Sequence, residues 1–91
     1  MLYVGLDLSR KRLDWHALLA DGEQLGADAC PPDSDGLAHL VHRLGRDQGP
    51  VLAAIESMSG ARFVHDQLEL AGWDVRIADA VRVKGPGAAR L

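Results

Sequence analysis

The sequence lacks several features that mark common classes of protein. Its single cysteine, Cys30, excludes an internal disulfide and a cysteine cluster around zinc, which fits a reducing compartment. No apolar run is long enough to span a membrane, and no basic segment precedes the first apolar residues as in a signal peptide. We therefore expect a cytoplasmic protein with no membrane partner.

An excess of positive charge is also missing. Ten lysine and arginine residues stand against thirteen aspartate and glutamate residues, giving a net charge of −3. Modules that coat nucleic acids carry a clear positive excess. This stretch alone is therefore not expected to bind DNA through a basic surface, although an enzyme that holds acidic metal ligands here can carry its DNA-binding surface elsewhere in a longer protein.

What is present is the composition of an ordinary globular protein. The chain has 91 residues, of which 47% are hydrophobic and 25% are charged. This length corresponds to one small domain or a piece of a larger one. We find no internal repeat and no low-complexity segment.

The first third of the chain predicts three strands. Residues 2–8 are rich in apolar side chains on both sides of an extended chain, as in an interior strand. Two further runs, residues 13–20 and 23–27, are separated by Asp21 and Gly22. An Asp-Gly pair between two such runs is the strongest short signal for an antiparallel hairpin.

Helices and strands are then predicted to alternate. Asp33 or Ser34 can cap a first helix that ends at Gly45. Residues 51–56 follow, without alternation of apolar and polar side chains, which predicts a strand covered on both faces.

A second helix is predicted from about residue 60 to residue 71, capped by Ser57 or Ser59, and residues 73–78 form the fifth strand. The predicted fold is thus α/β with a mixed five-stranded sheet in the order β-β-β-α-β-α-β. It has an antiparallel meander, a parallel half and a right-handed crossover at each helix.

Two acidic residues stand at the ends of strands that are otherwise largely apolar. Asp7 lies near the end of the first strand and Glu56 ends the fourth. Burial of an ionised carboxylate is costly unless a partner or a metal compensates. If the strands are neighbours, Mg²⁺ or Mn²⁺ between the two carboxylates would relieve their repulsion. The alternative is that each acid simply ends a strand and faces solvent.

Three segments together resemble a known family. Residues 3–15, YVGLDLSRKRLDW, resemble the "vGiDvskkxldv" opening of the insertion-sequence-110 transposases and the Piv-like DNA invertases. Residues 53–60, AAIESMSG, are similar to the "aiEatgg" signature of that family. Residues 70–78 with Val83 and Lys84 are similar to its "aGhxVxvvnpxxvk" stretch, and the three segments occur in the family's order.

The resemblance implies an RNase H-like (RuvC-like) domain whose DEDD tetrad of acids binds divalent metal and cleaves and joins DNA strands in transposition. Asp7 matches the first aspartate and Glu56 the glutamate, and both are therefore predicted catalytic and metal-binding residues. The last two aspartates have no match, because the sequence after Lys84 passes through glycine and proline and ends. We accordingly expect a partial domain over residues 1–80 and an irregular tail over 81–91, cut before the domain is complete. With half a tetrad, Mg²⁺ or Mn²⁺ should bind weakly, and catalysis by this chain alone is left open.

Further site and partner expectations follow from the same resemblance. The basic turn of Arg10, Lys11 and Arg12 directly after Asp7, together with Lys84, is predicted to contact nucleic acid, although such a run also occurs in solvated loops. The family implies DNA as the partner of the parent protein, raises a guide RNA as a second partner, and suggests a homo-oligomer.

Other polar and aromatic residues are assigned no chemistry. His39 and His42 lie three residues apart on the first predicted helix but have no third ligand nearby, so we expect them to be exposed. His16 and His65 are expected to be structural or surface residues. Trp15 and Trp73 are expected to pack in the core or at the edge of the sheet.

Alternative functions remain open at this point. The acetate and sugar kinase group also opens with a strand, an aspartate and a hairpin, but its "DxGxT" loop needs glycine where Leu8 stands and a hydroxyl where Lys11 stands. A Holliday-junction resolvase-like nuclease shares the fold and the metal chemistry. A non-catalytic transposase remnant that acts only as an interaction module is the third possibility.

Overall fold

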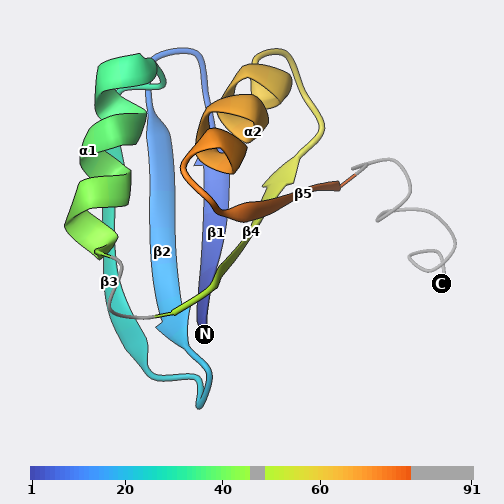
Figure 1. The fold of residues 1–91 in the computed structure, drawn as a ribbon. Coiled ribbons are helices and arrows are strands. Elements are labelled where there is room, and N and C mark those ends of the chain that lie inside the picture. Colours follow the sequence, from blue (N-terminus) through green and yellow to red (C-terminus); the bar gives the residue numbers. More distant parts are fainter. Residues whose placement is uncertain (46–48, 79–91) are drawn as a thin grey trace, which may run out of the picture.

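The computed structural model describes residues 1–45 and 49–78, which form five strands and two helices in the predicted order (Figure 1). The elements are β1 (Leu2–Leu8), β2 (Leu13–Leu19), β3 (Gln24–Cys30), α1 (Ser34–Leu44), β4 (Val51–Glu56), α2 (Ala61–Leu70) and β5 (Asp74–Ala78). The predicted tail over residues 81–91, and Lys84 with it, lies outside the described residues.

The strands form one mixed sheet in the order β3-β2-β1-β4-β5. Strands β1, β2 and β3 pair as an antiparallel meander, whereas β4 pairs in parallel with β1 on one side and with β5 on the other. This mixed topology confirms the predicted fold class and is that of an RNase H-like sheet. It makes β1 the central strand and places β4 beside it.

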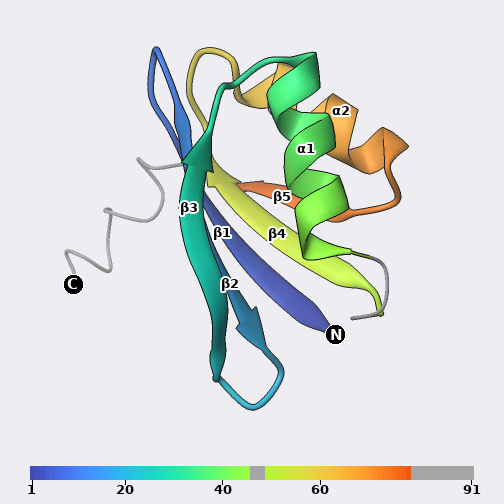
Figure 2. The same ribbon diagram turned by 90° about the vertical axis from the view of Figure 1, so that its left-hand side faces the viewer.

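Both helices lie on the same face of the sheet (Figure 2). The connection through α1 leads from β3 to β4, and the connection through α2 leads from β4 to β5, so both advance in the same direction across the sheet. Crossovers between parallel strands share one hand, and connections that advance the same way therefore place their helices on the same side. The opposite face, which we call the open face, is covered by no element of the described residues.

The core lies between the sheet and the helices. Side chains at alternate strand positions are buried against apolar residues of α1 and α2, and the largest fully buried ones are Leu2, Leu13, Leu37, Leu40, Ile55, Val64 and Leu68. Trp15 and Trp73 are buried as well, which confirms their predicted packing role.

The prediction that residues 51–56 are covered on both faces is wrong for the described structure. Val51, Ala53 and Ile55 are buried, whereas Ala54 and Glu56 are exposed. The small side chain of Ala54 removed the polar contrast by which a one-sided strand is recognised, because alanine is common on both covered and exposed surfaces.

Most of the predicted turns and helix caps are present in the structure. The amide of Leu19 donates to the carbonyl of Glu23 across the hairpin turn (2.8 Å), and Gly22 takes the positive φ of 93° that this turn requires. Asp33 caps α1 by accepting a hydrogen bond from the amide of Gly36 (2.7 Å), and Gly45 follows the helix as predicted.

The predicted serine caps of the second helix are wrong. The residue before α2 is Gly60 with a φ of 91°, and no side chain caps this end. A left-handed conformation at that position strongly favours glycine over serine. Val64 and Leu68 are buried, whereas Phe63 and Ala71 are exposed.

Close backbone packing holds α1 against the end of β3. A Cβ atom placed on Gly36 would overlap the backbone carbonyl of Pro31. The first turn of α1 can therefore lie this close to the chain only because residue 36 has no side chain.

Candidate functional site

Asp7 and Glu56 lie at the same edge of the sheet. The parallel register of β1 and β4 pairs Leu6 with Ile55, and the next residue along each strand is an acid. Because side chains alternate along a strand, both acids lie on the open face. They line the same broad hollow, whose volume is about 750 Å³. The structure thus brings together the two acids that the sequence singled out.

Neither acid is buried. Asp7 and Glu56 are both exposed, so the argument that a metal is needed to offset the cost of burial is wrong. That argument assumed that a strand apolar on one side is covered on the other. What remains is the adjacency of two carboxylates on neighbouring parallel strands.

A third carboxylate lies in line with these two. Asp14 on β2 is the cross-strand partner of Asp7, it is half-buried, and it lines the same hollow. Asp14, Asp7 and Glu56 therefore form a row across three adjacent strands, which we call the acid row. Like charges directly opposite each other destabilise a sheet, so this arrangement is unfavourable unless a cation is near.

The positively charged side chain of Arg12 lies at one end of the acid row. Its Nε donates a hydrogen bond to one carboxylate oxygen of Asp14 (3.2 Å), and a second guanidinium nitrogen forms an ion pair with the other oxygen at 2.9 Å. The turn that positions Arg12 is closed by the amide of Ser9, which donates to the carbonyl of Arg12 (2.9 Å). Arg12 thus offsets the charge of Asp14 and leaves Asp7 and Glu56 as the two acids without such a partner among the described residues.

The remaining predicted basic residues are placed differently. Arg10 and Lys11 are exposed in the same turn but do not line the hollow, whereas Arg12 does. Contact of any of them with nucleic acid stays a prediction.

The far side of the hollow is formed by the β3 edge. Asp28 accepts a hydrogen bond from Arg43 of α1 (2.7 Å), and this bond, with that from the amide of Ala29, holds the pKa of the Asp28 carboxyl below its ordinary value. The Arg43 guanidinium also lies 5.2 Å from the centre of the Trp15 ring, within the range of a cation–π contact. This network ties β2, β3 and α1 together beside the hollow.

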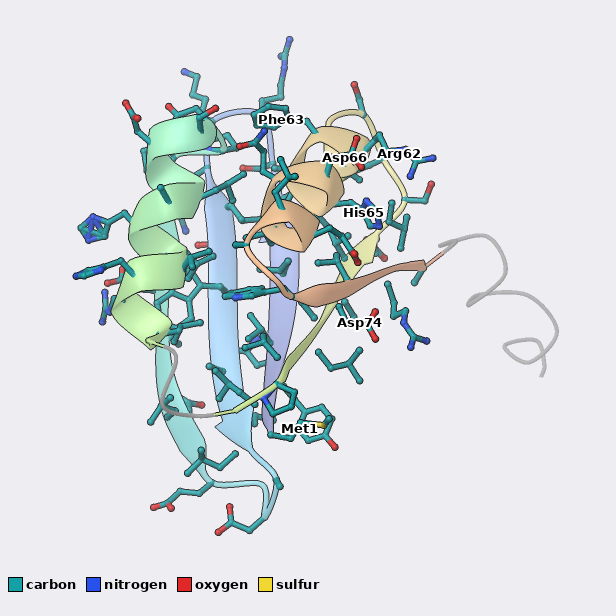
Figure 3. All side chains as sticks on the ribbon, in the orientation of Figure 1. Met1, Arg62, Phe63, His65, Asp66 and Asp74 are labelled. Atoms are coloured by element: carbon teal, nitrogen blue, oxygen red, sulfur yellow. The ribbon has the colours of Figure 1, made fainter. Side chains whose placement is uncertain are left out.

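His16 lies one row below the acids on the open face. It is the cross-strand partner of Gly5, and its imidazole occupies the space that a side chain at position 5 would fill. The other histidines are away from the hollow. His39 and His42 are exposed on α1, as predicted. His65 on α2 forms a hydrogen bond with Asp66 at 2.8 Å, and both side chains are labelled in Figure 3.

The sequence reasoning missed Asp14, Asp28 and His16 as parts of this hollow. The signal that could have found Asp14 is the hairpin register: with Leu8 opposite Leu13, Asp7 must face Asp14. The same register places His16 opposite Gly5. Asp28 depends on the β2–β3 pairing, which has a register shift between Ala17 and Leu18. A bulge of this kind changes which residues share a face, and its position is not visible in the sequence.

The donors in the hollow suit a hard divalent cation. Carboxylate oxygens are the protein ligands that Mg²⁺ and Mn²⁺ prefer. Among residues 1–45 and 49–78, however, no three acidic, histidine or cysteine side chains already form a group that could hold a metal ion. The residues present therefore fit such an ion in chemical type and supply part of a ligand set.

Comparisons with known proteins add no assignment. The sequence matches no protein family model, and it matches no curated protein. In the part of the chain that the structure describes, neither helix is long and apolar enough to cross a membrane.

Proposed function

We propose that this domain supplies part of a divalent-metal site in a DNA transposase or recombinase that cleaves and joins DNA strands. The proposal places the chain in the amino-terminal part of the parent protein, in the bacterial cytoplasm. The observation that carries it is the adjacency of Asp7 and Glu56 at the ends of two parallel central strands, on the open face of an RNase H-like sheet.

Two lines of support are independent of each other. The three sequence segments that resemble the insertion-sequence-110 and Piv-like family assign the first and second acids of its DEDD tetrad to Asp7 and Glu56. The strand order, which does not depend on those motifs, puts the same two residues side by side. A chance match of short motifs would not require their acids to meet.

Each residue has a definable role in the proposal. Mg²⁺ or Mn²⁺, when bound, would activate a water or hydroxyl nucleophile and stabilise the leaving oxygen of a phosphodiester. Asp7, on the central strand, and Glu56, on the next strand, would hold the ion. Arg12 keeps Asp14 paired at one end of the acid row, so that the ion is drawn toward the other two acids.

The tetrad's two remaining aspartates have no match in residues 1–91, so we propose weak metal binding and assign no catalysis to this chain alone. The parent protein's partner would be DNA, with a guide RNA as a second candidate, and the assembly would be a homo-oligomer. A Holliday-junction resolvase-like nuclease would use the same two acids. A second candidate function is that of a non-catalytic remnant that serves as an interaction module. It is favoured because no three possible metal ligands form a group among the described residues.

Paramagnetic broadening by Mn²⁺ tests the metal site. In nuclear magnetic resonance spectra of the chain, amide signals of Asp7 and Glu56 should broaden first as Mn²⁺ is added. The Asp7→Asn and Glu56→Gln variants should each require more Mn²⁺ for the same broadening. Glu23→Gln, at the exposed hairpin turn at the other end of the sheet, is the matched control and should behave as the unchanged protein.

Two results would contradict the proposal. Broadening centred on residues outside the hollow, or left unchanged by both acid substitutions, would remove the site. Tight and stoichiometric Mg²⁺ binding in calorimetry would contradict the expectation of an incomplete ligand set.

A further inference from the structure

His16 lies on the open face between neighbours with small side chains. Across the sheet its row contains Ala27, Gly5, Ala54 and Arg76, so the residues on both sides of the imidazole are alanine or glycine. His16 itself is exposed and lines the same hollow as Asp7 and Glu56. The ring therefore lies in the hollow between residues with small side chains on β1 and β3.

The ring lies over β1 because position 5 is glycine. A Cβ atom at Gly5 would overlap the Cε1 atom of His16 and would lie 2.8 Å from its Nε2 atom. None of the hydrogen bonds or ion pairs formed by the described residues uses a nitrogen of this ring. His65, in contrast, is engaged by acids of its own helix. The donor of His16 is thus available to something in the hollow.

The position of His16 relative to the acids limits what that ligand can be. His16 and Asp14 are two residues apart on one strand, which places them about 7 Å apart along the sheet on the same face. A ligand that contacts both the acid row and an imidazole N–H must combine a cation for the acids with a hydrogen-bond acceptor for the ring. A phosphodiester oxygen beside a divalent ion meets both requirements, whereas an anion alone would be repelled by the acid row.

We infer that His16 is a positioning residue that donates a hydrogen bond to a phosphodiester oxygen of a nucleic acid strand lying on the open face. This inference rests on the proposed function, because the strand approaches the acids only when a divalent ion is present. The shallow and open form of the hollow suits an extended strand. Gly5 has the complementary role of leaving room for the ring.

The four histidines give an internal comparison for the test. The ring Hε1 signals of His16, His39, His42 and His65 can be followed while a short single-stranded oligothymidylate is added in the presence of Mg²⁺. The His16 signal should move with the added strand, and the other three should stay in place. Inorganic phosphate at the same Mg²⁺ concentration separates a free anion from a strand, and it should move His16 far less.

Two substitutions separate hydrogen bonding from packing. His16→Gln keeps an N–H donor near the Nε2 position, whereas His16→Phe keeps a flat ring over Gly5 but has no donor. We expect His16→Phe to weaken oligothymidylate binding in Mg²⁺ by about threefold to tenfold, the usual worth of one hydrogen bond. His16→Gln should retain most of the affinity, and both variants should unfold at nearly the same denaturant concentration.

The outcomes are distinguishable from a failure of the metal site. If Mn²⁺ still broadens Asp7 and Glu56 but oligothymidylate leaves the His16 signal unmoved, the role of His16 is overturned and the metal site stands. Equal affinity of His16→Phe and the unchanged protein would overturn it as well. If Mn²⁺ does not bind at the acids, the proposed function fails. If oligothymidylate moves the His16 signal without Mg²⁺, the ion-dependent contact inferred here is contradicted.

Discussion

The two faces of the sheet are built from the same five strands and have opposite character. On the helix-covered face of β1, Leu2 is 0% exposed and Leu8 is 7% exposed, whereas Tyr3 on the open face is 41% exposed. The covered face is a uniform apolar layer. The open face changes along the strands from the acid row, through small residues and His16, to an apolar end near Tyr3. Alternate residues of one strand thus differ in environment: those on one face pack in the core, and those on the other face lie on the open side of the sheet.

The largest expected effect comes from a cavity on the covered face. Leu68 of α2 is 0% exposed, so Leu68→Ala should lower the free energy of unfolding by about 2–5 kcal/mol. Leu70 on the same helix is 83% exposed, and Leu70→Ala should change it by no more than about 0.5 kcal/mol. Chemical denaturation followed by circular dichroism measures both. Equal losses would mean that α2 does not pack as described.

Added methyl groups at two glycines should differ according to what they meet. Gly36→Ala forces a Cβ against the backbone carbonyl of Pro31, and it should cost about 1–3 kcal/mol despite the better helix propensity of alanine. Gly5→Ala meets only the His16 ring, which is exposed and can turn away, so its cost should stay below about 1 kcal/mol. Denaturation of the two variants side by side tests the contrast, and a larger loss for Gly5→Ala would contradict it.

The apolar end of the open face should promote self-association. Tyr3 is exposed, and it lines a shallow, mainly apolar hollow with the half-buried Leu18 and Leu52. Contiguous apolar surface of this kind is usually covered by a contact. Sedimentation equilibrium at micromolar concentration should give a mass above that of the monomer that rises with concentration, and Tyr3→Lys should lower it. Leu70→Lys, on the other side of the molecule, is the control. A clean monomer mass at all concentrations would refute this expectation.

The smallest effect is a pH dependence at the rim of the hollow. The hydrogen bond from Arg43 lowers the pKa of Asp28 below its ordinary value of 3.8 in the folded chain, and the unfolded chain has no such bond. The ion pair therefore stabilises the fold above pH 3.8, and this stabilisation is lost as the pH falls through the lower, folded-state pKa. Because both partners are exposed, the effect should be small.

Asp28→Asn provides the comparison for this effect. The difference in denaturation midpoint between the variant and the unchanged protein should be present at neutral pH and should shrink at the most acidic pH. A difference that persists undiminished in acid would show that Asp28 acts through something other than its charge.

Much of the covered face was predictable from local patterns. The Asp-Gly turn and the Asp33 cap each use signals that extend over a few residues, and the structure has both as expected. The mixed sheet was predictable because consecutive elements with crossovers of one hand allow few arrangements. The start of α2 was missed because a serine near a helix start is a common cap, whereas the chain here turns through Gly60.

The open face was harder to predict, because its features depend on which strands are neighbours. The meeting of Asp7 with Glu56 required β1 and β4 to be adjacent, which the resemblance and the fold class indicated. The pairing of Asp14 with Arg12 and the position of His16 over Gly5 are contacts that the sequence analysis did not predict. The small or apolar side chains beside the two acids hid the uncovered side of each strand, so the burial argument was wrong. The alternative, that each acid ends a strand and faces solvent, is confirmed.

The hydrogen bonds of Asp28 at the rim of the hollow also bear on the association of a second chain with the edge of the sheet. Strand β3 is the last strand of the sheet, and such a strand presents amide donors on which a foreign strand can assemble. The carboxylate of Asp28 accepts the amide of Ala29 (2.8 Å) while its other oxygen accepts from Arg43. That donor is no longer available to a foreign chain, and the guanidinium places bulk and charge beside the strand. The hydrogen bonds of Asp28, small as their share in folding stability is, thus remove one of the edge donors through which a second chain could pair with β3.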